Sequence, residues 1–279
     1  MSSKRFDVSR DNRSALDSRG AIDIDVASYS AEGSAAAAIS APETNRSVVT
    51  VGDIVHSDVL EALPGQIFRL GKRVFDIVAA SFGLLCFALI LPIVAVIIKL
   101  DSPGSVFYAQ ERVGLNRRRE RNGFGDGDRR KVLQPGRPFR IYKLRSMGRD
   151  AERNGPQWAT TGDMRVTRSG RFLRKTRLDE LPQLWNVLKG DMSLIGPRPE
   201  RLCFIRQLEN DVPFYHDRLL VKPGLTGLAQ VRNGYDEDIE GVKRKVEYDR
   251  RYIRNCNPLT EMGILLETVR VVIKGEGAK

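Results

Sequence analysis

Hydrophobic and polar residues divide the chain into three stretches of different pattern. Residues 1–66 show no sustained apolar period, whereas Ile77 to Ile98 form a run without a single charged residue. From about residue 102 onward, short alternating runs are mixed with segments of helical period. The pattern predicts a largely disordered N-terminal tail (1–66), an apolar membrane helix (67–101) and a folded domain (102–279).

The apolar run is long enough to cross a bilayer. As a helix with a rise of ~1.5 Å per residue it would cover roughly 33 Å. Pro92 lies inside it, removes one helical hydrogen bond and predicts a kink. Lysines and arginines flank both ends, and positive charge favours the cytoplasmic side of a membrane. The residues alone leave two geometries open: a plain span, or a broken helix that returns to the face it entered.

The folded domain combines short strands with helices. "GSVFYAQERVG" and "RPFRIYKLRSM" alternate in the manner of a β-hairpin, and a Gly-rich basic loop separates them. That loop lacks the aromatic platforms that stack nucleic-acid bases, so we expect it to be solvated or to lie on lipid headgroups. "LTEMGILLETVRVVIKG" has apolar residues at helical spacing and predicts a helix either at the membrane interface or in the core. The predicted fold class is mostly α with a small β element.

Charge is distributed unevenly along the chain. Residues 1–66 contain 6 Lys and Arg against 10 Asp and Glu, which leaves 40 against 25, a net charge of +15, for the remainder. Such a surplus calls for an acidic partner: nucleic acid, anionic lipid headgroups or a phosphorylated substrate. The three cysteines have neither the number nor the spacing of a disulfide framework or a zinc site, which indicates a reducing compartment.

Two adjacent acids open the segment "LDELPQLWNVLKG". We expect Asp179 to cap a helix whose first turn contains Pro182 and whose C-terminus is Gly190. Asp179 and Glu180 would then lie at a helix N-terminus, where free amides and the helix dipole favour ionised carboxylates. A purely structural cap is the alternative for Asp179.

Cations surround this acidic pair in the sequence. Five precede it between Arg168 and Arg177, and Arg198 follows it in the proline-bounded segment "DMSLIGPRPE". Two acids among so many cations suit an anionic substrate that is attacked by a carboxylate, while a metal ion and arginines neutralise its charge.

Several long motifs in order resemble one protein family. These are "KRVFDI", the proline-broken apolar helix, "SPGSVFYAQERVG", "FRIYKLRSM", "TRSGRFLRKTRLDELPQLWNVLKGDMSLIGPRPE" and "VKPGLTGLAQV". Over about residues 68–275 the chain resembles the bacterial sugar transferases, monotopic polyprenyl-phosphate hexose-1-phosphate transferases. It is most similar to the short forms that add galactosyl or glucosyl phosphate at the start of exopolysaccharide assembly.

The resemblance implies a membrane geometry. The anchor would be a re-entrant helix broken at Pro92, assisted by interfacial amphipathic helices. The catalytic domain (102–279) would lie on the cytoplasmic face of the bacterial inner membrane. Many relatives have Ser before this proline, whereas this chain has Leu91.

The resemblance also implies a reaction and its residues. Hexose-1-phosphate would pass from a UDP-sugar, UDP-galactose or UDP-glucose, to polyprenyl (undecaprenyl) phosphate, with release of UMP. Asp179 would be the nucleophile that carries a covalent phosphosugar, and Glu180 its metal or proton partner. Mg²⁺ or a similar divalent cation would lie at Asp179 and Glu180. Arg174 matches the phosphate-binding arginine of the family, and Lys143 and Arg198 match further cations of its motifs.

Other functions stay open at this point. A glycosyltransferase that moves the sugar alone would release UDP, and a catalytically idle scaffold would recruit other enzymes to the membrane. The intact set of Asp179, Glu180, Arg174 and Arg198 argues against the scaffold. We expect membrane lipid but no nucleic acid as a partner, and a homo-oligomer is left open.

Overall fold

A computed structural model describes residues 59, 61–116, 135–153, 155–157, 162–233 and 238–275. Most of the predicted tail (1–66) and most of the predicted basic loop lie outside these residues. The described elements, in chain order, are α3 (Gln66–Asp101), β1 (Phe107–Val113), β2 (Pro138–Leu144), α4 (Arg168–Lys175), the 3₁₀ helix η2 (Leu178–Gln183), α5 (Leu184–Lys189), β3 (Ser193–Ile195), α6 (Leu202–Leu208), the 3₁₀ helix η3 (Tyr215–Leu219), β4 (Gly224–Thr226), α7 (Leu228–Arg232), α8 (Ile239–Arg254) and α9 (Pro258–Lys274).

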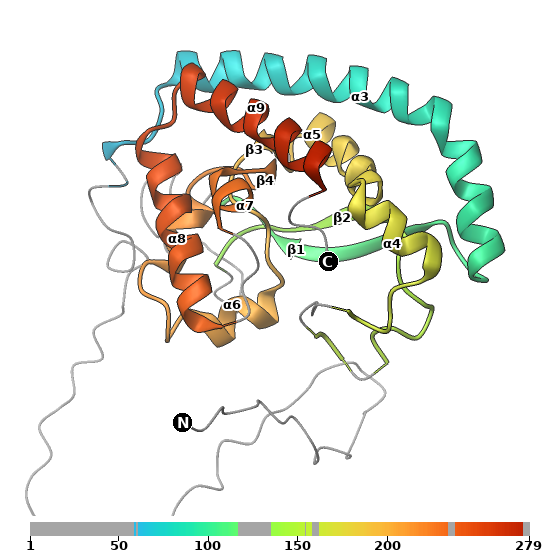
Figure 1. Ribbon diagram of the computed structural model, residues 1–279. Helices are drawn as coiled ribbons and strands as arrows, with labels where there is room; N and C mark the ends of the chain where they lie inside the picture. The colour runs from blue at the N-terminus through green and yellow to red at the C-terminus, as the bar shows by residue number, and fades with distance from the viewer. Residues whose placement is uncertain are drawn as a thin grey trace, which may run out of the picture. The chain divides into compact units, whose positions relative to one another are not determined.

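The fold is mostly helical with a small β element, as the sequence predicts. β1 and β2 pair antiparallel in a register from Phe107 opposite Leu144 to Val113 opposite Pro138, which confirms the predicted hairpin. The short strands β3 and β4 pair in parallel, Ser193 with Gly224 and Ile195 with Thr226. Figure 1 shows the hairpin crossing the middle of the body, with α3, α9 and α5 above it and α8 at one side.

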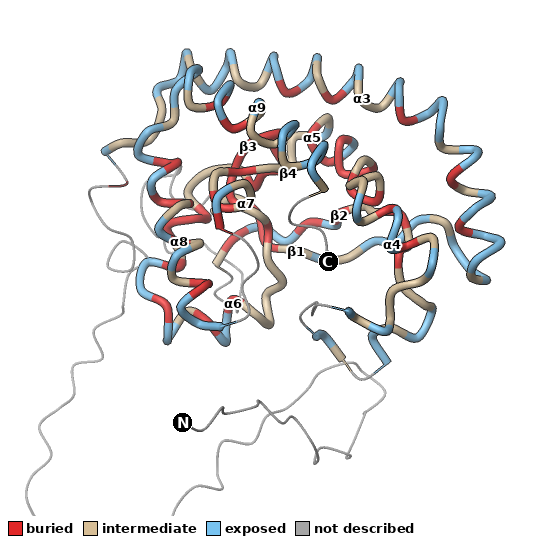
Figure 2. The backbone as a smooth tube through the Cα atoms, in the orientation of Figure 1, coloured by how far each residue is buried: buried red, intermediate tan, exposed pale blue. Residues whose placement is uncertain are grey.

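Helix α3 is the described helix that is long and apolar enough to cross a membrane. It extends over 36 residues and continues through Pro92. Figure 1 shows it bending in its second half, which contains this proline. Many of its large apolar residues are exposed. Figure 2 shows the exposed residues of α3 as pale blue stretches of the backbone tube. These features make α3 a candidate membrane anchor.

The N-terminal part of α3 is tied to the domain by polar contacts. Arg73 donates to the carbonyl oxygens of Val187 (2.6 Å) and Leu188 (2.7 Å), which belong to the last turn of α5. The buried Asp76 accepts hydrogen bonds from the start of β3, from the Ser193 hydroxyl at 3.1 Å and the Leu194 amide at 2.9 Å. Lys72 forms an ion pair with Glu261 of α9.

The C-terminal end of α3 is tied to the same domain through α4. Asp101 accepts hydrogen bonds from the amide (2.8 Å) and hydroxyl (2.7 Å) of Ser169. Arg145, which follows β2, donates to the carbonyl oxygens of Ser102 and of Pro103. Both ends of the apolar helix are therefore fixed to one compact body.

Apolar side chains form three buried clusters. The first joins α3, α5, β3, α8 and α9, and the second joins the end of β1 to α6, η3 and α8. The third lies under the distal half of α3, where Phe87, Val94 and Ile98 pack with Leu144 and Leu173. Leu178 and Leu181, which flank the acidic pair, pack against this third cluster. The apolar packing next to the acidic pair therefore comes partly from helix α3.

The predicted C-terminal helix is present as α9, and its surface is amphipathic. Ile264 and Glu261 are buried, whereas Leu259, Leu266 and Ile273 are among its exposed apolar residues. Asn257 caps its N-terminus by accepting a hydrogen bond from the Thr260 amide. The helical prediction is confirmed, and the interfacial placement stays a prediction.

The expected cap at Asp179 is wrong. The helical segment begins at Leu178 as a 3₁₀ helix, and the residue before it is Arg177, in a left-handed conformation (φ 58°) with no side-chain cap. The physical reason is the short connection: α4 ends at Lys175, so the chain must turn at Arg177. Gly190 does end α5 in the left-handed conformation, as predicted.

Helix α4 packs so closely that one position accepts no side chain. A Cβ on Gly170 would lie 2.0 Å from the carbonyl oxygen of Ser146, a backbone atom that cannot move aside. A Cβ on Gly263 in α9 would meet nothing within 4 Å.

We expect Gly170→Ala to lower the free energy of unfolding by on the order of 2 kcal/mol, because overpacking must displace α4. The matched variant Gly263→Ala should raise it by about 0.5–1 kcal/mol, since alanine is the better helix former. Thermal unfolding of the detergent-purified protein measures both. Equal effects of the two variants would contradict the close packing of α4.

Candidate active site

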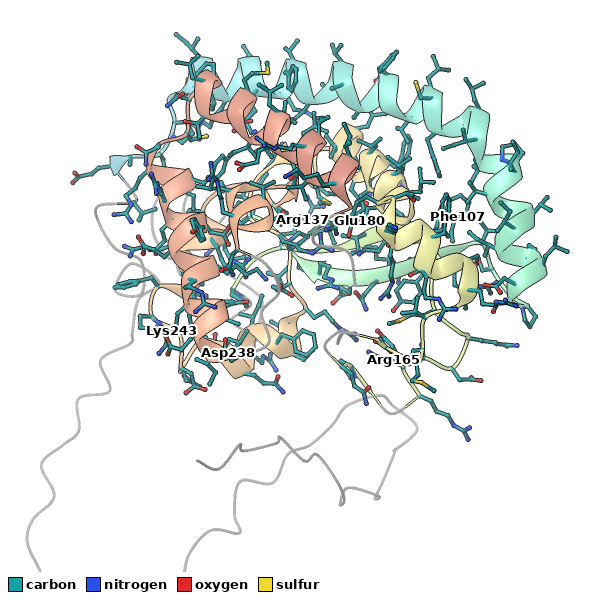
Figure 3. The ribbon with its side chains drawn as sticks, in the orientation of Figure 1. Phe107, Arg137, Arg165, Glu180, Asp238 and Lys243 are labelled. Atoms are coloured by element: carbon teal, nitrogen blue, oxygen red, sulfur yellow. The ribbon has the colours of Figure 1, made fainter. Side chains whose placement is uncertain are left out.

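The two acids of η2 are buried side by side. Asp179 is 6% exposed and Glu180 is 8% exposed. Strand β2 and helix α4 both pack against η2, and Figure 3 shows the labelled Glu180 near the centre of the described body. Burying two carboxylates is costly unless they are paired with cations or protonated. Their neighbours therefore decide what this site can do.

Glu180 is held by two cations that come from different elements. Arg198 donates to both carboxylate oxygens, at 2.6 Å to Oε1 and 3.4 Å to Oε2. The Lys143 Nζ lies 3.3 Å from Oε1. Burial opposes the ionisation of Glu180, but Arg198 and then Lys143 more than offset it and hold the pKa of this carboxyl well below its usual range. Glu180 is thus an ionised carboxylate at neutral pH, paired with two cations.

Asp179 has the opposite character. Burial and the neighbouring charge of Glu180 raise the pKa of Asp179 to about 6, although Lys143, Arg174 and Arg198 counteract them. At neutral pH the larger fraction of this carboxyl is ionised, in a position with little water around it. Burial thus outweighs the stabilisation that we expected from a helix N-terminus. A poorly solvated carboxylate is a reactive nucleophile because little hydration must be removed before it attacks.

Arg174 reaches the same region from the last turn of α4. Its Nε donates to the Ser146 hydroxyl at 3.0 Å, and its charge is among those that lower the pKa of Asp179. Ser146 is buried, and its backbone is in close contact with α4 at Gly170. The packing of α4 on the segment after β2 therefore directs one guanidinium toward the acidic pair.

Strand β2, which carries Lys143, is held by the buried amide of Asn186, a residue that the sequence pattern does not single out. The Asn186 side chain of α5 donates to the carbonyl oxygen of Arg140 (2.7 Å) and accepts from the amide of Tyr142 (3.2 Å). It binds both backbone groups on the free edge of β2, next to Lys143. Ser146 and Asn186 both lie inside the quoted motifs, but nothing in their spacing indicates which backbone they contact.

The structure thus brings four predicted residues together. Asp179, Glu180, Lys143 and Arg198 form one cluster, in which the two carboxylates are buried and the two cations are partly exposed, and Arg174 lies beside it. Pro92 belongs to a different element, helix α3. The roles that the resemblance assigns to these residues stay predictions.

A divalent cation fits this site only with help from a substrate. No group of three or more His, Cys, Asp or Glu side chains that could hold a metal occurs among the described residues. Mg²⁺, however, is commonly held by one or two carboxylates together with substrate phosphates and water. Glu180 is already occupied by two cations, so Asp179 offers the less committed oxygens. The donor set fits a Mg²⁺ ion that arrives with a diphosphate.

Comparison with known proteins identifies related sequences. The model of the bacterial sugar transferase family matches residues 67–275. The chain is 43% identical over 228 residues to the UDP-N-acetylgalactosamine-undecaprenyl-phosphate N-acetylgalactosaminephosphotransferase of Aeromonas hydrophila, a match that covers 81% of this chain and 49% of that protein.

Two further relatives are named for glucose. The UDP-glucose:undecaprenyl-phosphate glucose-1-phosphate transferase of Caulobacter vibrioides is 40% identical over 77% of this chain and 74% of its own length. The Escherichia coli protein of the same name is 37% identical over 72% of this chain and 40% of its own length. The chain therefore spans about half the length of some relatives and most of the length of others.

The raised pKa of Asp179 predicts a pH-dependent stability difference. The Asp179 carboxyl binds its proton more tightly in the native state than in the unfolded state. Raising the pH from ~4 to ~7 therefore lowers the free energy of unfolding. In EDTA, the wild type should therefore lose on the order of 2 kcal/mol over this range relative to Asp179→Asn, which carries no ionisable group there.

Thermal unfolding of both proteins across this pH range checks the prediction. The exposed Asp211 supplies the control variant Asp211→Asn, which reports the general effect of losing one carboxylate. The raised pKa would be contradicted if the melting temperatures of the wild type and of Asp179→Asn differ by the same amount at every pH.

Proposed function

Because the chain belongs to the bacterial sugar transferase family, we propose that it transfers hexose-1-phosphate from a UDP-sugar to polyprenyl phosphate, in particular undecaprenyl phosphate, and releases UMP. The observation that carries this proposal is the buried pair of η2, in which one carboxylate is neutralised by cations and the other is left poorly solvated. This reaction would be the first membrane step of an exopolysaccharide or related glycan.

The first step is a displacement at phosphorus. A carboxylate oxygen of Asp179 attacks the phosphorus that bears the sugar, and a P–O bond to Asp179 forms. The bond between this phosphorus and the bridging oxygen breaks, and UMP leaves with that oxygen and its electron pair. The ionised form of Asp179 is required, and it predominates above the pKa of about 6.

The second step regenerates the enzyme. A phosphate oxygen of the polyprenyl phosphate attacks the same phosphorus, and the bond to Asp179 breaks. Asp179 returns as a free carboxylate, and the product is a polyprenyl diphosphate sugar. Neither step needs a proton donor as long as the attacking and leaving oxygens remain ionised.

Cations make the approach of these anions feasible. Arg198 and Lys143 neutralise Glu180, so that only one uncompensated carboxylate faces the diphosphate. Arg174, held by Ser146, is placed to bind a phosphate oxygen. When bound together with the diphosphate at the acidic pair, chiefly through Asp179 because Glu180 is already paired with two cations, Mg²⁺ would screen the repulsion between substrate and carboxylate.

The sugar is the least constrained part of the proposal. Relatives are named for N-acetylgalactosamine and for glucose, so the donor panel must extend beyond the UDP-galactose and UDP-glucose that the resemblance suggests.

The anchoring of α3 supports a re-entrant helix, with the catalytic domain on the cytoplasmic face. The N-terminal part of α3 is bound to α5 and β3, and its C-terminal end is bound to α4. A plain span would place these two ends on opposite sides of a hydrocarbon core ~30 Å thick. One compact domain cannot bind both ends in that geometry, whereas a helix that returns to its own side satisfies both sets of contacts.

The reaction predicts which nucleotide is released. Membranes containing the protein, supplied with undecaprenyl phosphate, Mg²⁺ and UDP-sugars carrying galactose, glucose, N-acetylgalactosamine or N-acetylglucosamine, should release UMP with at least one donor. Asp179→Asn should lower the rate by at least a factor of ~1,000, because an amide cannot form the covalent intermediate.

Three outcomes separate the alternatives. Release of UDP that survives Asp179→Asn would replace the proposal with transfer of the sugar alone. Absence of any nucleotide in membranes shown to contain folded protein would favour an idle scaffold. UMP release that continues in the asparagine variant would contradict the aspartyl intermediate while leaving the transferase activity intact.

The re-entrant geometry predicts that both ends of α3 are accessible from one side. In a chain with its three native cysteines replaced, Glu61→Cys and Ser105→Cys should each react with a membrane-impermeant maleimide in inverted vesicles and stay protected in intact spheroplasts. Labelling after permeabilisation is the control for reactivity. Opposite behaviour of the two positions would mean that α3 spans the bilayer.

A further inference from the structure

The loop that carries Arg198 is held by its carbonyl groups. Pro197 and Pro199 have no N–H, so this segment cannot pair as an ordinary strand. Each carbonyl oxygen from residue 197 to residue 200 nevertheless accepts a hydrogen bond. The donors are the Gly224 amide to Pro197 (2.9 Å), the Arg218 guanidinium to Arg198 (3.1 Å), the Arg112 guanidinium to Pro199 (3.3 Å) and the Val113 amide to Glu200 (2.9 Å).

Arg218 is the donor that acts on the peptide of Arg198 itself. It lies in η3 and is 4% exposed. Its Nε and one terminal nitrogen pair with Asp249 of α8 (3.1 and 3.0 Å), and its other terminal nitrogen donates to the Tyr215 hydroxyl at 3.0 Å. All three guanidinium nitrogens therefore have partners other than the Arg198 carbonyl, and these partners fix the orientation of the group.

A buried ion pair of this kind is weak support for a purely stabilising role. Apolar residues of similar volume would often stabilise such a position equally well or better. What Arg218 supplies beyond stability is a rigid fork, which connects α8 and η3 to one carbonyl of the active-site loop. The side chain of that same residue, Arg198, reaches Glu180 at 2.6 Å.

We infer that Arg218 is a positioning residue for Arg198. It orients the peptide from which the Arg198 side chain extends, and so it sets the distance at which Arg198 neutralises Glu180. The inference rests on the proposed function, because its readout is the transfer reaction. Arg218 itself donates to the Arg198 backbone. Among the described residues, its side-chain hydrogen bonds go to Asp249, Tyr215 and Arg198, and none goes to the acidic pair.

The test is Arg218→Lys, which keeps a positive charge beside Asp249 but loses the fork. A single ammonium cannot span Asp249, the Tyr215 hydroxyl and the Arg198 carbonyl in the same geometry. We expect kcat for UMP release to fall about 10-fold or more, since small misplacements of catalytic groups are costly, while KM for the UDP-sugar changes little. All assays run well below the melting temperature of every variant.

The matched control is Arg250→Lys. Arg250 is also buried, donates to Asp217 at 2.8 Å and lies over the Phe214 ring at 4.0 Å. Its replacement should lower Tm to a similar extent as Arg218→Lys and leave kcat close to that of the wild type. The comparison separates a loss of stability from a loss of positioning.

A double-mutant cycle with Arg198→Lys identifies the group through which Arg218 acts. If Arg218 serves Arg198, adding Arg218→Lys to Arg198→Lys should lower kcat by less than about twofold, because the positioned guanidinium is already absent. If Arg218→Lys does not fold, Tyr215→Phe removes one hydrogen bond from the same guanidinium and enters the same cycle.

The outcomes distinguish the inference from the proposed function. Absence of UMP from the wild type would defeat the proposed function. The positioning role would be overturned if the wild type releases UMP and both Arg218→Lys and Arg250→Lys keep the kcat of the wild type. Independent, multiplicative losses in the double variant would overturn it as well.

Discussion

The ion cluster around Glu180 is the interaction on which the site depends. Two adjacent carboxylates are removed from water in η2, and this placement is tolerable only because Arg198 and Lys143 neutralise one of them. Those two cations come from separate parts of the chain, the loop after β3 and strand β2. Each part needs its own support, and Asn186 supplies it for β2. Polar contacts from separate parts of the chain therefore support the cations that neutralise a single carboxylate.

Helix α3, the candidate membrane anchor, and the acidic site share the same packing. Leu178 and Leu181, on either side of the acidic pair, pack against apolar residues from the distal half of α3. At its other end, α3 binds the C-terminus of α5 and the start of β3 through Arg73 and Asp76. Helix α3 is consequently part of the scaffold of the site and packs against the segment that bears the acids. If α3 is the anchor, as we propose, this packing fixes the depth of the acidic pair relative to the bilayer.

Elements with a clear period could be predicted from the sequence, and elements defined by distant contacts could not. The hairpin, α3 and α9 follow from alternation, an uncharged run and helical spacing. The three-residue strands β3 and β4 are too short to have a period, and their parallel pairing joins segments about thirty residues apart. The cap at Asp179 was wrongly predicted because the turn at Arg177 depends on where α4 ends. The residues of the acidic site were identified through the motif, but their burial and partners depend on tertiary packing.

The asymmetry between the two acids gives a physical reason to assign the nucleophile. Both belong to the same turn and are buried to a similar extent, so position and burial alone cannot distinguish them. Cations distinguish them, because Arg198 and Lys143 hydrogen-bond to Glu180 and lower its pKa, whereas Asp179 has its pKa raised to about 6. A carboxylate whose oxygens are occupied by cations must lose those bonds before it can attack. In the proposed reaction, Asp179 would break fewer bonds on attack than Glu180, and its higher pKa would make it the stronger nucleophile of the two.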